Sequence, residues 1–179
     1  QEDARTFPSS PYGRTKLFIE DIVRDWTAVE DNRSSVILRY FNPIGADASG
    51  LIGENPRGIP NNLMPLMLDV AIGKRDELLV FGDDYNTPDG TGIRDYIHVD
   101  DLAYGHVSAL DFTSRTSGVE VFNLGTGTGV SVLELIAAFE RVTGQTIAYQ
   151  ITPRRPGDVG ISLADPSQAK EILGWEARL

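Results

Sequence analysis

Tyr12 and Lys16 lie four positions apart in the segment SSPYGRTKLFIEDIVRDW (residues 9–26). In a helix, residues at that spacing share one face. A phenol ionises near pH 10 and is a poor base at neutral pH, but an ammonium within about 4–6 Å favours the phenolate. Such a pair can take a proton from a hydroxyl group during catalysis. The spacing alone is a weak motif, and an ordinary packing role for the tyrosine remains the alternative.

The elements that position this pair follow from the pattern of apolar residues. A helix is expected to begin near Tyr12, with Pro11 in its first turn. Its expected apolar face contains Leu17, Ile19, Ile22, Val23 and Trp26. The β-branched and aromatic run 36–41 that follows is short enough for a buried strand.

The rest of the chain alternates between strands and helices. Strands are expected at 78–82, at 121–125 and before the loop that begins near residue 153; helices are expected at 63–73, from about residue 100, at 131–144 and at 166–173. Helix-length connections favour a parallel α/β sheet, in which ligands bind at the carboxyl ends of strands. The long loop 42–62, with four glycines and three prolines, and the loops after Phe81 and Leu124 occupy such positions. The glycines of GTGTG (125–129) lack the G-x-G-x-x-G spacing, so we expect a tight turn there.

Composition excludes several classes of function. The chain has 16 Lys and Arg against 26 Asp and Glu, a net charge of −10 that disfavours nucleic-acid binding. No apolar run approaches the length of a membrane span. The absence of cysteine excludes disulfides and thiolate metal sites, and it fits a cytoplasmic setting. The two histidines, His98 and His106, are expected to be structural, and no metal site is predicted.

Several ordered segments resemble one enzyme family. They are VILRYFNPIGAD, GIPNNLMPLM, LLVFGDDYNTPDGTGIRDYIHVDDLA, VFNLGTGTGVSVLELI, RRPGD and LGW. In this order and at these spacings the chain resembles the UDP-glucose 4-epimerases of the extended short-chain dehydrogenase/reductase superfamily. The resemblance covers nearly the whole chain, and DGTGIRDYIHVDD with GIPNNLMP is far more specific than the Tyr–Lys spacing.

The resemblance implies NAD as cofactor and a UDP-sugar as substrate, with interconversion of UDP-glucose and UDP-galactose through a transient 4-keto sugar. It implies that Tyr12 is the acid/base and that Lys16 holds the nicotinamide ribose and tunes Tyr12. The cofactor-binding residues that it implies are Tyr12, Lys16, Tyr40, Phe41 and Pro43.

The resemblance also implies a set of substrate-binding residues, which are Asn42, Asn62, Leu63, Phe81, Arg94, Arg155, Asp158 and Ser162. Guanidinium groups suit a diphosphate, an aromatic ring suits a flat base, and a carboxylate can accept hydrogen bonds from ribose hydroxyls. Each residue could also have a structural role that involves no ligand. Arg94 could form a structural ion pair, Arg154 and Arg155 could lie in a solvated turn, and Phe81 could be a core residue.

Family members have a glycine-rich dinucleotide fingerprint upstream of the catalytic tyrosine, and only eleven residues precede Tyr12. We therefore expect a C-terminal portion of the family fold, inactive alone: part of a Rossmann-type parallel sheet domain plus a smaller α/β domain for the nucleotide sugar. Residues 1–60 are assigned to the first, and 61–179 mainly to the second, with about 95–130 returning to the Rossmann sheet. The resemblance also implies a homodimer in the full-length protein.

Ser162 aligns with a family position that lines the sugar pocket, where a small side chain leaves room for an N-acetyl group. The alternatives left open are another nucleotide-sugar epimerase, dehydratase or decarboxylase of the same superfamily, and a noncatalytic nucleotide-sugar-binding fragment.

Overall fold

The computed structural model describes residues 1–179, and they form two compact units that are interleaved along the chain. Unit 1 contains residues 1–43, 97–127 and 164–179, and unit 2 contains residues 44–96 and 128–163. No helix in the structure is long and apolar enough to cross a membrane.

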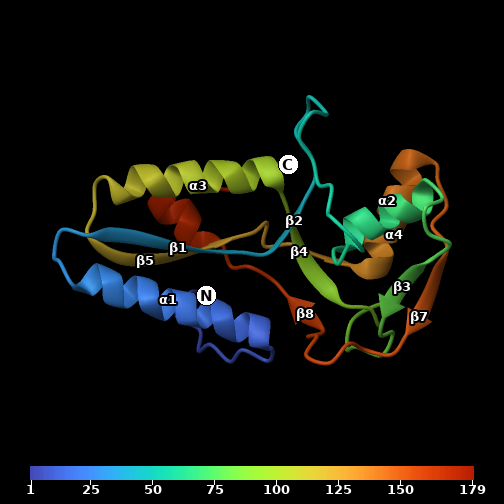
Figure 1. The fold of residues 1–179 in the computed structure, drawn as a ribbon, viewed down its shortest axis with the longest axis horizontal. Coiled ribbons are helices and arrows are strands. Elements are labelled where there is room, and N and C mark those ends of the chain that lie inside the picture. The colour runs from blue at the N-terminus through green and yellow to red at the C-terminus, as the bar shows by residue number, and fades with distance from the viewer. The chain divides into compact units, whose positions relative to one another are not determined.

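Unit 1 is built on a pair of parallel strands. Its elements are α1 (Pro11–Ala28), β1 (Ser34–Tyr40), α3 (Val99–Thr113), β5 (Gly118–Leu124) and the short π-helical turn η1 (Ala169–Leu173). β1 pairs with β5 in register from Ser34 opposite Gly118 to Tyr40 opposite Leu124, so both strands end at the same edge. Helices α1 and α3 run on either side of this pair (Figure 1).

The core of unit 1 joins β5 to the C-terminal segment. Its buried members are Ile97, Phe122, Leu124, Ala169 and Trp175. Phe112 of α3 meets Phe122 edge-on with ring centroids 5.6 Å apart, and the indole of Trp175 donates a hydrogen bond of 2.9 Å to the backbone oxygen of Asp101. The C-terminal residues therefore anchor α3 against the sheet.

Helix α1 begins where the sequence predicts, with Ser10 as the N-cap and Pro11 as its first residue. The expected apolar face divides in two, because Leu17 and Val23 are half-buried while Ile19, Ile22 and Trp26 are exposed. On the inner side, Glu20 forms a two-pronged ion pair with Arg39 of β1, at 2.8 and 2.7 Å. A charged pair thus takes part in docking α1 on the strand.

Unit 2 combines helices with short strands. Its elements are α2 (Leu63–Ala71), β3 (Leu78–Phe81), β6 (Gly129–Ser131), α4 (Val132–Thr143), β7 (Tyr149–Thr152), β8 (Ile161–Ser162) and most of β4 (Ile93–His98). A further short strand, β2 (Asn42–Ile44), lies where the chain passes from unit 1 to unit 2. The buried core, made by α2, β3, α4 and the segment before β7, consists of Met67, Leu78, Val80, Ile136 and Ile147.

The strand pairings of unit 2 confirm the α/β class. One pairing is antiparallel, where the sequence predicts a parallel sheet. β3 pairs with β7 and β4 with β8, both in parallel, whereas β6 runs antiparallel to β4 with Ser131 opposite Ile93. The glycine-rich segment 125–129 turns the chain back along β4 before α4 begins, so it leads into a short strand rather than directly into the helix. Ser131 then caps α4 in a capping box with Glu134.

The close approach of α3 to β5 gives a test of this packing. A methyl group added at Gly105 would lie 2.6 Å from a methyl of Leu124 and 3.3 Å from the indole nitrogen of Trp175. We expect Gly105→Ala to lower the free energy of unfolding by about 1–3 kcal/mol through overpacking. Urea denaturation followed by tryptophan fluorescence measures this change. Val107→Ala, on the exposed side of α3, is the control, and equal stability of Gly105→Ala and wild type would contradict the packing.

The Glu20–Arg39 pair predicts a dependence of stability on pH. The hydrogen bond from Arg39 lowers the pKa of Glu20, so its contribution to stability is present above the unfolded pKa of about 4.3 and is lost as pH falls through the lower folded value. The stability difference between wild type and Glu20→Gln should therefore be largest near pH 6 and shrink towards pH 3. Urea denaturation at both pH values measures it, and a difference that grows on acidification would refute the prediction.

Candidate functional site

The Tyr–Lys pair lies in the first turns of α1. The hydroxyl of Ser10 accepts a hydrogen bond of 3.1 Å from the backbone nitrogen of Gly13, which fixes the start of the helix. The ammonium of Lys16 lies 5.2 Å from the ring centroid of Tyr12. Tyr12 is 71% exposed, so its phenol is open to a ligand. The structure thus brings the two predicted catalytic side chains together on an accessible face of the helix.

The other candidate residues of unit 1 follow the carboxyl end of β1. Tyr40 is the last residue of the strand, and its ring lies 6.0 Å from the ring of His106 on α3. The backbone nitrogen of Phe41 donates to the backbone oxygen of Leu124 at 3.2 Å, which extends the pairing of β1 with β5 by one residue. Asn42 and Pro43 then begin β2. All four residues therefore lie at a strand end, where parallel sheets bind ligands.

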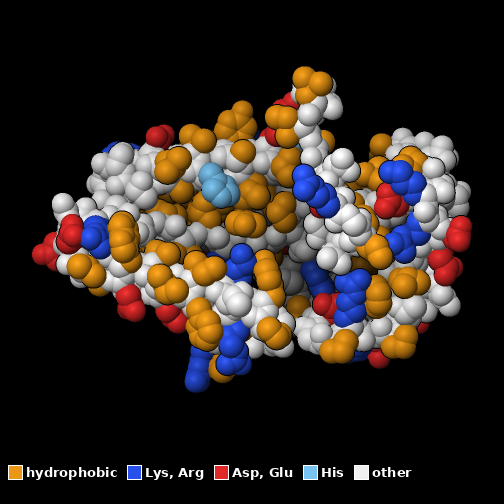
Figure 2. All heavy atoms as spheres, in the orientation of Figure 1, with side chains coloured by type: hydrophobic (Ala, Val, Ile, Leu, Met, Phe, Trp, Pro, Cys, Tyr) orange, Lys and Arg blue, Asp and Glu red, His pale blue; other side chains and the backbone are white.

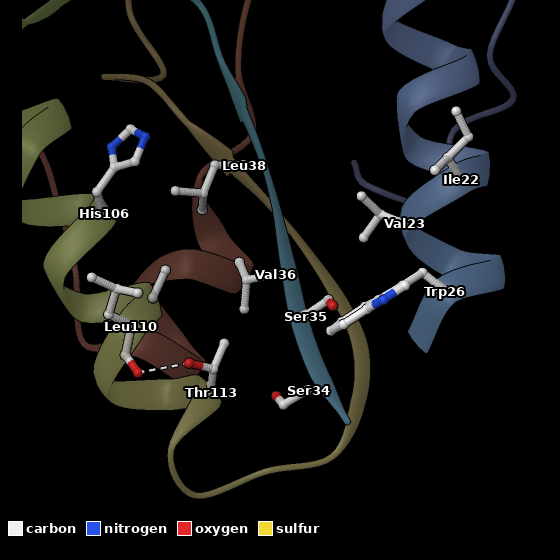
Figure 3. Close-up of a pocket in the computed structure, with 11 residues that line it drawn as sticks. Ile22, Val23, Trp26, Ser34, Ser35, Val36, Leu38, His106, Leu110 and Thr113 are labelled. Atoms are coloured by element: carbon white, nitrogen blue, oxygen red, sulfur yellow. Dashed lines mark hydrogen bonds between the residues drawn. The ribbon is translucent and has the colours of Figure 1, made fainter. Parts of the chain in front are cut away.

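A groove of about 690 Å³ runs along β1 between α1 and α3, where hydrophobic side chains gather in a hollow (Figures 2 and 3). Its lining residues are Ile22, Val23, Trp26, Ser34, Ser35, Val36, Leu38, His106, Ala109, Leu110 and Thr113. Successive residues of a strand point to opposite faces, so a groove lined by both Ser35 and Val36 lies at the edge of β1. β1 pairs only with β5, and this second edge has no strand beside it.

In unit 2, the parallel pairing of β3 and β7 brings two predicted substrate residues into contact. Phe81 ends β3 opposite Thr152 of β7, and Arg155 follows in the next loop. The guanidinium of Arg155 lies 3.7 Å from the centroid of the Phe81 ring, within the range of a cation–π contact. The backbone nitrogen of Asp158 donates to the backbone oxygen of Arg155 at 3.2 Å, so Asp158 belongs to the same loop turn.

A second contact between candidate residues involves Arg94 and Ser162, which are partners in the parallel pairing of β4 with β8. The guanidinium of Arg94 donates to the backbone oxygens of Ile93, at 2.9 Å, and Gly160, at 3.5 Å. It forms no ion pair with the adjacent Asp95. This half-buried cation is therefore held by backbone carbonyl groups, and no carboxylate neutralises it.

Asn62 and Leu63 stand at the start of α2. Asn62 is the N-cap, and its side-chain amide donates to the carboxylate of Glu54 at 2.8 Å rather than to the helix. Leu63 is the first helical residue and packs against the core of unit 2. The thirteen candidate residues thus fall into two groups, one on each unit.

The sequence reasoning missed the residues that order the loop after β3. One carboxylate oxygen of Asp89 accepts hydrogen bonds of 2.8 Å from both the backbone nitrogen and the hydroxyl of Thr91. The other accepts from the hydroxyl of Ser131. Burial opposes ionisation of Asp89, but the hydrogen bonds from Ser131 and Thr91 outweigh it and lower its pKa. In the sequence, the turn signal Pro88-Asp89-Gly90 could have indicated that this loop is ordered.

A second missed group joins this loop to the loop after β7. Arg154 forms an ion pair with Asp84, at 2.6 Å, and its guanidinium lies 4.1 Å from the ring centroid of Tyr85. The hydrogen bond from Arg154 lowers the pKa of Asp84. Sequence reasoning treated Arg154 only as a neighbour of Arg155, because nothing in the spacing shows which loop an arginine will reach.

Comparison with known proteins places this geometry in a family. The family model described as "NAD dependent epimerase/dehydratase family" matches residues 1–125. The UDP-glucose 4-epimerase of Bacillus subtilis (strain 168) is 55% identical over 177 residues, which are 99% of this chain and 52% of that protein.

Solved structures agree. A crystal structure of UDP-glucose 4-epimerase from Stenotrophomonas maltophila, with bound NAD and formylated UDP-arabinopyranose, has a TM-score of 0.95 at 53% identity and covers 99% of this chain and 53% of its own. The enzyme from Bifidobacterium longum in complex with NAD⁺ and UDP has a TM-score of 0.94 at 53% identity, covering 98% and 52%. The chain spans about half the length of the relatives that it matches. With its Tyr–Lys helix and its strand-end loops, the chain belongs to the NAD dependent epimerase/dehydratase family.

Proposed function

We propose that the protein functions as a UDP-glucose 4-epimerase, which interconverts UDP-glucose and UDP-galactose with NAD as cofactor. The observation that carries the proposal is the Tyr12–Lys16 pair, which has an accessible phenol and an ammonium 5.2 Å from its ring. Relatives of that name at about 55% identity and structures of them with NAD or UDP support it. The proposed role in galactose metabolism rests on the same relatives.

In the proposed reaction, Tyr12 acts as acid and base at the 4-hydroxyl group of the sugar. Its phenolate takes the hydroxyl proton when the sugar is oxidised and returns a proton when the 4-keto sugar is reduced on its other face. Lys16 favours the phenolate by its charge. When bound, NAD supplies the chemistry of reversible hydride transfer at C4, and the reaction has no net change in redox state.

The residues of unit 1 fit a nicotinamide nucleotide. Lys16 offers a cation and donor for ribose hydroxyls, and its side chain is exposed. Tyr40, Phe41 and Pro43 supply apolar surface for a ring at the end of β1. We assign these three residues, with Tyr12 and Lys16, to cofactor binding.

The residues of unit 2 fit a uridine diphosphate. Arg155 and Arg94 bring two cations that no carboxylate neutralises, which suits the two phosphates. Phe81 offers an aromatic face for the base, and Asp158 offers acceptors for the ribose. We also assign Asn42, Asn62, Leu63 and Ser162 to substrate binding, the first of them on unit 1.

We further propose that unit 1 is part of the NAD-binding domain and that unit 2 is the nucleotide-sugar domain. These boundaries follow the compact units and replace the division at residue 60. The groove at the free edge of β1 supports the proposal, since an apolar hollow beside unpaired backbone fits a further parallel strand of the same sheet. The exposed apolar side chains of α1 support a homodimer of the whole protein. A cytoplasmic location is proposed from the cysteine-free composition.

The role of Tyr12 is tested by Tyr12→Phe in a protein that joins residues 1–179 to a complete NAD-binding half. Loss of the proton acceptor should lower kcat for UDP-galactose conversion by about 10²–10⁴-fold. The Kd for UDP should stay unchanged, because the UDP contacts are assigned to other residues. A coupled assay and isothermal titration calorimetry measure both quantities.

The matched control is Tyr104→Phe, which removes the same hydroxyl from an exposed tyrosine of α3. Full activity of Tyr12→Phe would refute the assignment. If the wild-type protein binds UDP but does not convert UDP-galactose, the result would favour a noncatalytic nucleotide-sugar-binding protein.

Ser162 generates a prediction on sugar specificity. It is a half-buried residue of β8, and it pairs with Arg94, which is assigned to the diphosphate. In the same protein joined to a complete NAD-binding half, we expect epimerisation of UDP-GlcNAc as well as UDP-glucose, and we expect Ser162→Tyr to lower kcat/KM for UDP-GlcNAc by about 10–200-fold more than for UDP-glucose. The neighbouring Ile161→Tyr, with an exposed side chain, is the control. Absence of UDP-GlcNAc turnover by a protein that epimerises UDP-glucose would disprove the prediction.

A further inference from the structure

The proposed nucleotide site is built from two loops that leave neighbouring strands. β3 and β7 are parallel, with Phe81 opposite Thr152, so the loops 82–92 and 153–160 start side by side. The first loop follows Phe81, and the second carries Arg155 and Asp158. Binding one nucleotide with both loops costs less free energy when their relative position is fixed before the ligand arrives.

Arg154 joins the two loops through three contacts. Its Nε donates to a carboxylate oxygen of Asp84 at 2.6 Å, and a terminal nitrogen donates to the backbone oxygen of the same residue. The guanidinium also lies 4.1 Å from the ring centroid of Tyr85. A planar guanidinium can make both kinds of contact at once, whereas an ammonium is a single point charge.

Tyr85 fills the space beneath Arg154. Its side chain is only 7% exposed, and its hydroxyl is buried without a hydrogen-bond partner, so the ring serves packing. A Cβ atom at Gly82 would lie 2.7 Å from a ring carbon of Tyr85 and 2.8 Å from Cγ of Arg154. A Cβ atom at Gly160 would lie 3.2 Å from the same ring. Gly82 belongs to the first loop and Gly160 to the second, so the ring is packed between both loops.

The neighbouring arginine has a different environment. Arg155 is exposed, forms no ion pair, and contacts the ring of Phe81 at 3.7 Å. Its guanidinium lies over the aromatic face that a base would use. The two consecutive arginines therefore differ: Arg154 is held by hydrogen bonds, an ion pair and a ring, while Arg155 stacks on a ring and forms no ion pair.

We propose that Arg154 is a positioning residue of the nucleotide site. With Asp84 and Tyr85 it fastens the loop after β3 to the loop after β7, and this holds Phe81 and Arg155 where one UDP molecule can meet both. The inference rests on the proposed function for the identity of the ligand. Arg154 itself does not need to touch the ligand, because its guanidinium is already committed to Asp84 and Tyr85.

The charge of the pair alone does not account for this role. Asp84 and Arg154 are both exposed to solvent at their charged ends, and exposed ion pairs contribute little to stability. The two hydrogen bonds to Asp84 and the stacking on Tyr85 fix the orientation of the Arg154 guanidinium. A lysine at position 154 would keep the charge and lose both features, so Arg154→Lys is expected to behave like Arg154→Ala.

The experiment measures two properties of the full chain, wild type and variants. Hydrogen exchange in the absence of ligand measures how often the loop after β3 opens. The amides to follow are those of Gly82 and Tyr85, which donate to the backbone oxygens of Thr152 and Gly90, respectively. Calorimetric titration with UDP measures the affinity of the proposed nucleotide site. For Arg154→Ala and Arg154→Lys we expect exchange at these amides to rise by roughly tenfold or more, and UDP affinity to fall by about tenfold or more.

Arg155→Ala is the matched control, since it should weaken UDP binding and leave loop exchange unchanged. Exchange in α4, which belongs to the same unit as the two loops, shows that this unit is folded in each variant. UDP affinity in Arg154→Ala equal to wild type would overturn the positioning role while the proposed function stands, and so would unchanged loop exchange or full rescue by lysine. Failure of the wild-type protein to bind UDP would overturn the proposed function and the ligand named here, whatever the exchange shows.

Discussion

Parallel strand pairing is the constraint on which the arrangement of candidate residues depends. Two parallel strands end at the same edge, so residues far apart in the sequence become neighbours there. Phe81 and Arg155 meet because β3 and β7 are paired, and Tyr40 and Leu124 lie opposite each other because β1 and β5 are paired. The buried cores of the two units pack against these strands, and most of the candidate residues lie at or after the strand ends.

The sequence predicted the elements well where the local signals were strong. Pro11 marked the start of α1, and the expected helix at 131–144 agrees with α4, which spans Val132–Thr143. The α/β class followed from the alternation of strands and helices. The antiparallel β6 was missed because it has only three residues, and the exposure of Ile19, Ile22 and Trp26 was missed because the amphipathic pattern does not show which apolar residues reach the core.

The sequence named a set of candidate residues but not the contacts among them. The Tyr–Lys spacing predicted a shared helix face, and the structure has the two side chains together. The partnership of Arg154 with Asp84 spans 70 positions of sequence, and no local pattern encodes it. The different contacts of the two adjacent arginines become visible only in the structure, where Arg154 lies over Tyr85 and Arg155 over Phe81.

The free edge of β1 has a consequence for the handling of the chain in solution. A strand with unpaired backbone groups, flanked by exposed apolar side chains such as Ile22 and Leu110, is a template that accepts any compatible strand. The chain should therefore self-associate at high concentration unless that edge is occupied. Production together with a segment that supplies the next strand should therefore reduce this self-association.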